Sequence, residues 1–424
     1  MTASEFRRRV SAIQAELKRR GLDALVAIKP EHVRYVSGFW GYSTRTEYAS
    51  PRRLIAAVVP ASGDCTLIVP KIELLFAQRR TWMKDVRHHV EWEQPDEVFG
   101  GIALLERVLR EKGIGGRIGI EHGFVSVRLH SQLREALPGV TLDDATEVVE
   151  GLRIIKSPEE IAILRIGGRM AVKEFLAEAN MIRAGVKEFE IAMRGRDVAS
   201  ELFAARLADG KNRVPIDHPV VDGPQILTSG PRLDMVHAIA TTRTVKAGDM
   251  VLLDLCRLPQ YENYRIGFSR NVSLRKPSAD ELDKFRLGLE AYRMAVKLVR
   301  PGTPAEAPDL TARAFLDKHG LGDTFVHRTG RGVGLEAAER PEIGAGDKTP
   351  LRPGMVVTIE PSIYEPDFAF HVEDTYLVTE TGAECLTEVG RDLRVVPSRG
   401  KAGHGAPRPK TAKAKTSVRR SRRR

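Results

Sequence analysis

Apolar residues in the first 150 positions switch between helical and strand periodicity. Those from Phe6 to Leu17 recur at helical spacing, and Gly21 follows as a helix-ending residue. An apolar run at 24–28 predicts a strand, and the runs LIAAVV and CTLIVP flank a Ser-Gly-Asp turn as in a hairpin. RIGIE at 117–121 predicts another strand. This alternation predicts a small α/β domain over residues 1–150.

The rest of the chain carries clear helix starts. Ser157 precedes a proline at the first helical position, and Glu160 completes a capping box. Ser278, with Glu281, opens another helix, which carries a second amphipathic run. Helices interleaved with short β-runs predict an α+β domain over 151–397, in which the helices back a curved, mostly antiparallel sheet.

Three carboxylates fall inside short β-runs: Asp254 in VLLDL, Glu360 in VVTIEP and Glu373 in FHVEDTYLV. Period-2 alternation places Glu373 on the strand face of His371 and Thr375. A buried carboxylate is destabilising unless something compensates its charge. The pattern therefore predicts a metal site, a set of basic partners or an acid/base centre.

The net charge of +11 is confined to one end of the chain. Residues 398–424 contain eleven Lys and Arg and no acid, while the 56 other basic residues equal the 56 acidic ones. This composition predicts a disordered tail, and if the protein binds nucleic acid, we expect it to bind only through this tail.

The sequence shows no membrane or secretion signal. The longest apolar runs are too short to span a bilayer, and the N-terminal segment MTASEFRRRV lacks the apolar core of a signal peptide. The three cysteines form no motif. We expect a cytoplasmic protein without membrane contact.

The order of these motifs resembles a known family. Asp254 is followed by an H-x-x-G-x-G-x-G segment from His327, by Ile-Glu-Pro at 359–361 and by Glu-Asp-Thr at 373–375. This order resembles the pita-bread family of methionine aminopeptidase, aminopeptidase P, prolidase and creatinase, and LDALVAIKPEHVRYVSGFWGY resembles the creatinase-type N-terminal domain. The resemblance implies a pita-bread catalytic domain after a smaller α/β domain.

The chain departs from the family at its metal ligands. The resemblance implies two divalent ions held by two Asp, one His and two Glu, but Gly267 or Arg265 stands at the second Asp and Arg331 at the His. A further family histidine falls at Ala338. Ligand positions remain at Asp254, Glu360 and Glu373. Arginine cannot coordinate a cation, so we expect no cofactor, with one weakly held Mn, Co, Zn or Mg ion as the alternative.

Arg331, with Arg265 or Arg270, is instead expected to supply the positive charge among the acids. If so, replacing Arg331 with Ala destabilises the fold or creates metal affinity.

Creatinase implies a reaction for such a site, the hydrolysis of a C–N bond in a small amidino or guanidino compound. His237 would then exchange protons with water and the leaving nitrogen, Glu360 and Glu373 would bind the substrate's cationic group, and His327 would orient the substrate. Arg45 would reach the partner's site in a homodimer and bind the substrate carboxylate. Asp254 and Arg331 complete the expected substrate-binding set.

Two alternatives stay open. The first is an Xaa-Pro aminopeptidase or dipeptidase with a rearranged metal site, and the second is a non-catalytic binding module. His371, His218 and His319 are interpreted as ordinary surface or strand histidines, and Cys256 as core packing.

Overall fold

The computed structural model describes residues 1–43, 53–207, 223–255 and 261–396. Arg45, His218, Cys256 and the tail 398–424 therefore lie outside the described residues, and the expectations about them stay predictions. Among the described residues, no helix combines the length and the apolar character needed to cross a membrane.

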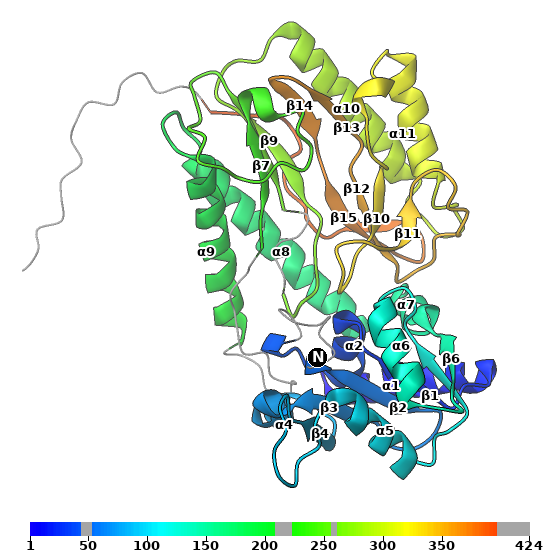
Figure 1. Ribbon diagram of the computed structural model, residues 1–424. Helices are drawn as coiled ribbons and strands as arrows, with labels where there is room; N and C mark the ends of the chain where they lie inside the picture. Colours follow the sequence, from blue (N-terminus) through cyan, green and yellow to red (C-terminus); the bar gives the residue numbers. More distant parts are fainter. Residues whose placement is uncertain (44–52, 208–222, 256–260, 397–424) are drawn as a thin grey trace, which may run out of the picture.

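The N-terminal part is a mixed sheet covered by helices (Figure 1). Its strand order is β4-β3-β2-β1-β5-β6, and the predicted hairpin of β2 and β3 is confirmed. The strands and main helices are α1 Ala3–Arg20, β1 Ala24–Ala27, α2 Pro30–Ser37, β2 Ala56–Pro60, β3 Thr66–Pro70, α4 Leu74–Arg80, β4 Asp85–His89, α5 Gly101–Glu111, β5 Arg117–Ile120, α6 Val127–Ala136, β6 Thr141–Asp144 and α7 Thr146–Arg153.

Two sheets and a hairpin form the second part, with α8 and α9 on one side and α10 and α11 on the other (Figure 1). The strand orders are β11-β10-β12-β15-β16 and β17-β9-β8-β7, and β13 pairs with β14. The elements are α8 Pro158–Met181, α9 Glu188–Leu207, β7 Ile226–Ser229, β8 Met250–Asp254, β9 Ser269–Ser273, α10 Ala279–Lys297, α11 Ala307–Lys318, β10 Gly330–Gly332, β11 Glu339–Ile343, β12 Val356–Ile359, β13 Ser362–Glu365, β14 Phe368–His371, β15 Asp374–Val378, β16 Ala383–Cys385 and β17 Arg394–Val395.

The capping box predicted at Ser157 is present, and the helix start predicted at Ser278 is a capping box as well. Each serine side chain accepts a backbone N–H, and the glutamate three residues later accepts the serine's own N–H, so two otherwise unsatisfied donors are paired at each helix start. These helices fix the two faces against which the acid-bearing strands pack.

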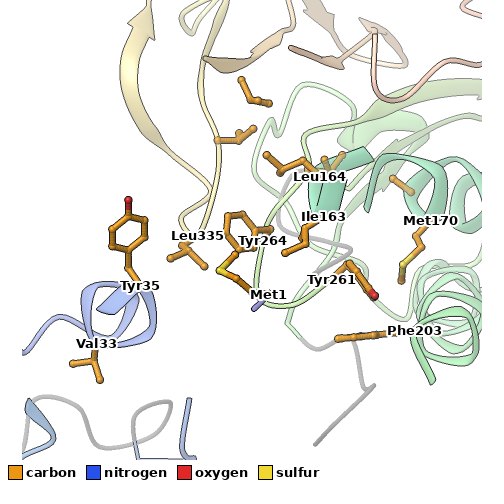
Figure 2. Close-up of a cluster of buried hydrophobic side chains, with 14 of the residues drawn as sticks. Met1, Val33, Tyr35, Ile163, Leu164, Met170, Phe203, Tyr261, Tyr264 and Leu335 are labelled. Carbon is orange, nitrogen blue, oxygen red and sulfur yellow. The ribbon is translucent and has the colours of Figure 1, made fainter. Parts of the chain in front are cut away.

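An apolar core joins the two parts of the molecule. Figure 2 shows Met1 and Tyr35 from the N-terminal part near Ile163, Tyr264 and Leu335 from the second part. Polar groups cross the same boundary, since the Tyr264 hydroxyl accepts from Arg9 (3.0 Å) and donates to Glu160 (2.8 Å). The segment leading into β9 is thereby anchored to the N-terminal part.

Two buried acids on α8, Glu174 and Glu178, lie against α9. Both side chains are fully buried, and Gly195 of α9 leaves room for Glu178, because a Cβ there would meet Glu178 Oε1 at 2.0 Å. Gln225 donates to Glu178 (3.0 Å), whereas neither oxygen of Glu174 has a hydrogen-bond partner among the residues that the structure describes. Burial raises the pKa of Glu174 to about 8 and that of Glu178 well above its usual range.

Replacing Glu174 with Gln should stabilise the protein. The unfolded Glu174 loses its proton near its ordinary pKa of 4.5, whereas the folded one keeps it to about pH 8. Stability should therefore fall as pH rises from about 4.5 to 8 and then level off. At pH 8 we expect a gain of about 4 kcal/mol in the free energy of unfolding for the variant, measured by urea denaturation. An equal gain at pH 4.5 would contradict this explanation.

Candidate active site

Three strand ends bring the predicted carboxylates together. Asp254 ends β8, Glu360 directly follows β12, and Glu373 directly precedes β15. An isolated bridge between Ser269 and Glu373 joins the two sheets at this point. Burial is nearly complete, with Asp254 5%, Glu360 8% and Glu373 0% exposed, so their charges need partners within the protein.

Arg331 supplies one such partner, as predicted from the family resemblance. Its Nη1 forms a short ion pair with Glu360 Oε1 and lies 3.1 Å from Glu373 Oε1. The same nitrogen donates to Thr358 Oγ1 (3.0 Å), and Nε donates to the Ala337 carbonyl (2.8 Å). Several directed contacts therefore hold the guanidinium among the acids.

The loop that carries Ala337 is held from the N-terminal part. Arg153 of α7 donates to Glu336 (2.9 Å) and also pairs with Glu339, while Lys156 donates to Glu339 (3.0 Å). Ala337 lies between these two glutamates, and its carbonyl accepts from Arg331 Nε. The ion pairs between the two parts of the molecule therefore help to position Arg331.

The expectation for Arg270 as a partner of the site acids needs a correction. Arg270 binds the Asp374 carboxylate (2.8 Å) and the Glu373 backbone carbonyl (2.8 Å). Asp374 also accepts from Tyr292 (2.6 Å) and Arg391 (2.7 Å). Arg270 thus stabilises the strand beside the site, because a fully buried Asp374 needs cationic partners of its own.

The acids have opposite protonation preferences. Burial alone would raise the pKa of Glu360, but the Arg331 guanidinium together with His371 and His327 outweighs it and lowers that pKa to about 2. Burial raises the pKa of Glu373 well above its usual range, and the Glu360 charge adds to this effect. The pKa values of these two neighbouring acids are therefore shifted in opposite directions.

Histidines complete the site. His327 Nε2 lies 2.9 Å from the Tyr364 hydroxyl, which lies 3.1 Å from His371 Nδ1. Burial lowers the pKa of His327, so its imidazole is neutral at neutral pH.

Two other histidines can be compared with their predicted roles. The interpretation of His371 as an ordinary strand histidine is wrong, because its Nε2 is 3.5 Å from Glu360 Oε2. His319 bonds the Phe315 carbonyl on an exposed helix end, as expected for a surface histidine.

A cavity of about 210 Å3 opens onto these groups. His237 is exposed on its wall, whereas Glu373 is fully buried. The lining residues are Ile226, Val236, His237, Asp254, His327, Arg328, Arg331, Ala337, Ala338, Glu360, Tyr364 and His371. The predicted His237, His327, Asp254, Glu360 and Arg331 thus share one cavity, and sequence reasoning missed Tyr364 and Ser269.

The residues do not fit a pair of divalent cations. A Cβ at Gly267 would meet Glu373 Oε1 at 2.1 Å and Thr358 Cγ2 at 2.4 Å, so the Glu373 carboxyl fills the space that an Asp side chain would need. One oxygen each of Glu360 and Glu373 and a ring nitrogen of His371 lie within 4.8 Å of one another, close enough to share one ion. Arg331 already binds both of these glutamates. A single weakly held cation would require Arg331 to move aside.

Comparison with known proteins gives two family matches. Residues 162–380 match the metallopeptidase family M24, and residues 9–155 match the creatinase/prolidase N-terminal domain. An Xaa-Pro dipeptidase of Pyrococcus furiosus is 30% identical over 92% of this chain and 100% of its own length. A probable dipeptidase PepE of Mycobacterium tuberculosis is 31% identical over 93% of this chain and 98% of its own length. The crystal structure of dipeptidase PepE from Mycobacterium ulcerans has a TM-score of 0.75 at 30% identity, covering 93% of this chain and 98% of that one.

Proposed function

The chain belongs to metallopeptidase family M24, and from this premise we propose that it hydrolyses the C–N amide bond of small Xaa-Pro-type substrates, with Arg331 as the fixed cation of its site. The full-length similarity to proteins named Xaa-Pro dipeptidase carries this proposal. We therefore prefer the alternative expectation, an Xaa-Pro peptide substrate, to the main expectation, an amidino or guanidino compound. The cavity of about 210 Å3 fits a substrate of dipeptide size.

The site residues have distinct roles in this proposal. His237, exposed on the cavity wall, takes a proton from water as the water attacks the carbonyl carbon, and returns it to the leaving nitrogen. Arg331 faces the carbonyl oxygen and stabilises the negative charge that develops there. Asp254 and Glu360, which line the same cavity, bind the substrate's ammonium group.

One observation favours a second candidate. Arg331 stands among acids where the family resemblance implies a metal ligand, and the resemblance associates such a site with C–N bonds in guanidino or amidino compounds. A planar cationic group would bind Asp254 and Glu360 through paired hydrogen bonds. The two candidates share the cavity and differ only in the substrate.

Steady-state assays separate these functions. Protein treated with a chelator should hydrolyse Ala-Pro and Gly-Pro, with Ala-Ala and creatine as comparison substrates. His237→Gln should lower kcat by about 100-fold or more, whereas His319→Gln, at an exposed helix end, should retain full activity. Turnover of creatine alone would support the second candidate. The absence of turnover with all four would contradict both and leave the binding-module alternative.

A further inference from the structure

Arg328 is a second arginine on the wall of the active-site cavity. It lies just before β10, which pairs with β11 (Figure 1). Its side chain lines both this cavity and a more open hollow of about 700 Å3, which Arg340 and Glu342 also line. Arg328 therefore stands at the border between the active-site cavity and this outer hollow.

The chain around Arg328 is held in place from several sides. The Thr329 N–H donates to Asp309 of α11 (2.8 Å), and the Thr329 carbonyl accepts from the Glu360 N–H (2.6 Å). The stem of Arg328 packs against Gly344, where a Cβ would meet Arg328 Cβ at 3.1 Å. The position of Arg328 relative to the site acids is thus fixed before a substrate binds, which reduces the entropy lost on binding.

The protein engages only the Nε edge of the Arg328 guanidinium. Nε donates to the Gly330 carbonyl (3.1 Å) and lies 2.6 Å from Glu342 Oε2. Neither Nη1 nor Nη2 forms a hydrogen bond with any residue that the structure describes. The pair with Glu342 has side chains that are 41% and 47% exposed, so it contributes little to stability. Two donor groups are left for a ligand, and a carboxylate can accept from both.

A dipeptide carries two charges, and the site has so far supplied partners for only one of them. The ammonium group lies beside Asp254 and Glu360 in the proposed function, whereas the carboxylate has no cation. Arg331 lines the same cavity, but Glu360 and Glu373 already accept from it. Arg328 is the other arginine among the described residues of the cavity wall. Creatine, the compound that tests the second candidate, also carries a carboxylate.

We propose that Arg328 binds the free carboxylate of the substrate and makes the site selective for substrates that end at this group. This inference deepens the proposed function and rests on it for the identity of the substrate. With both ends bound, the scissile amide lies between them, near His237 and Arg331. A substrate that is amidated at this end lacks the charge and loses the ion pair. The role of Arg328 does not depend on Arg45, whose expected contact with the same carboxylate stays a prediction.

Paired substrates test this role. Ala-Pro and its C-terminal amide share the ammonium group, the proline ring and the scissile bond, and they differ in the carboxylate. Arg328→Gln should raise KM for Ala-Pro by about 30-fold, because it removes hydrogen bonds between two charged groups. It should leave kcat nearly unchanged and should not alter KM for the amide. Arg328→Lys keeps the charge without the two-pronged geometry and should recover only part of the loss.

Arg340→Gln is the matched control. Arg340 is exposed and lines the outer hollow, and it is not among the described residues that line the active-site cavity. The variant removes the same charge as Arg328→Gln and should change KM for neither substrate. Equal increases in KM for Ala-Pro and its amide in Arg328→Gln would overturn the proposal, because the effect would then be structural.

Calorimetry separates this role from the proposed function. In the His237→Gln background, where turnover is slowed, Arg328→Gln should raise the Kd of Ala-Pro by the same factor as KM and leave that of the amide unchanged. If Ala-Pro binds without turnover and Arg328→Gln weakens the binding, the role of Arg328 stands although the proposed function fails. Turnover with equal KM in wild type and Arg328→Gln would overturn the role and leave the proposed function. A wild-type protein that binds neither Ala-Pro nor creatine would overturn both.

Discussion

Replacing Arg331 with methionine should lower the free energy of unfolding by about 3 kcal/mol, because removing one partner of a buried ion pair leaves the other charge uncompensated. Glu360 is 8% exposed and loses its cationic partner, and Glu373 loses a donor at 3.1 Å. Methionine preserves much of the side-chain volume, so the loss reports on charge more than on packing. Urea denaturation of wild type and variant at pH 7 measures the difference.

A double-mutant cycle supplies the control. Glu360→Gln in the Arg331→Met background removes the uncompensated charge and should recover most of the lost stability. The exposed pair of Arg340 and Glu147 is a suitable comparison, since both side chains are 51% exposed and Arg340→Met should change stability by less than about 1 kcal/mol. Equal losses at Arg331 and Arg340 would contradict the assigned role of Arg331.

Replacing Arg331 with histidine should create a site for one divalent cation. The change removes a cation from the acids and adds a ligand nitrogen beside Glu360 and Glu373, and His371 already lies within reach of both. Imidazole and carboxylate together bind Mn, Co and Zn. Calorimetric titration of the chelator-treated variant with MnCl2 should give binding at least about 100-fold tighter than wild type, which corresponds to about 2.7 kcal/mol.

Arg331→Gln is the matched variant, because it removes the charge without adding an imidazole. It should bind the ion more tightly than wild type and less tightly than Arg331→His. Gly267→Asp should add no affinity in the wild-type background, since a Cβ there would meet Glu373 at 2.1 Å. Wild-type binding equal to that of Arg331→His would show that Arg331 does not exclude the ion.

Local rules were enough to predict much of the fold from the sequence. The capping boxes at Ser157 and Ser278 depend on residues three positions apart, and both are present. The three acids could be recognised because a charge within an apolar β-run needs compensation, although Glu360 and Glu373 lie just outside the observed strands. Arg331 could be placed among the acids only through the resemblance to a family with a ligand at that position.

The remaining site residues depend on contacts between distant segments. His371 approaches Tyr364 because β13 and β14 form a hairpin, and Ser269 meets Glu373 because two sheets join there. No local pattern encodes this junction. One signal was available, since strand alternation places His371 on the same face as Glu373, and a histidine beside a buried acid could have been assigned to the site. The placement of Arg270 on Asp374 likewise depends on packing between segments about 100 positions apart.

Elemental analysis of the purified, untagged protein, combined with assays with and without chelator, tests most directly whether Arg331 replaces a metal pair. The account predicts well under one bound divalent ion per chain and turnover that survives chelation. One or two tightly held ions per chain, with activity lost on chelation and restored by the metal, would contradict it, because Arg331 would then have to leave the acids to admit the ions.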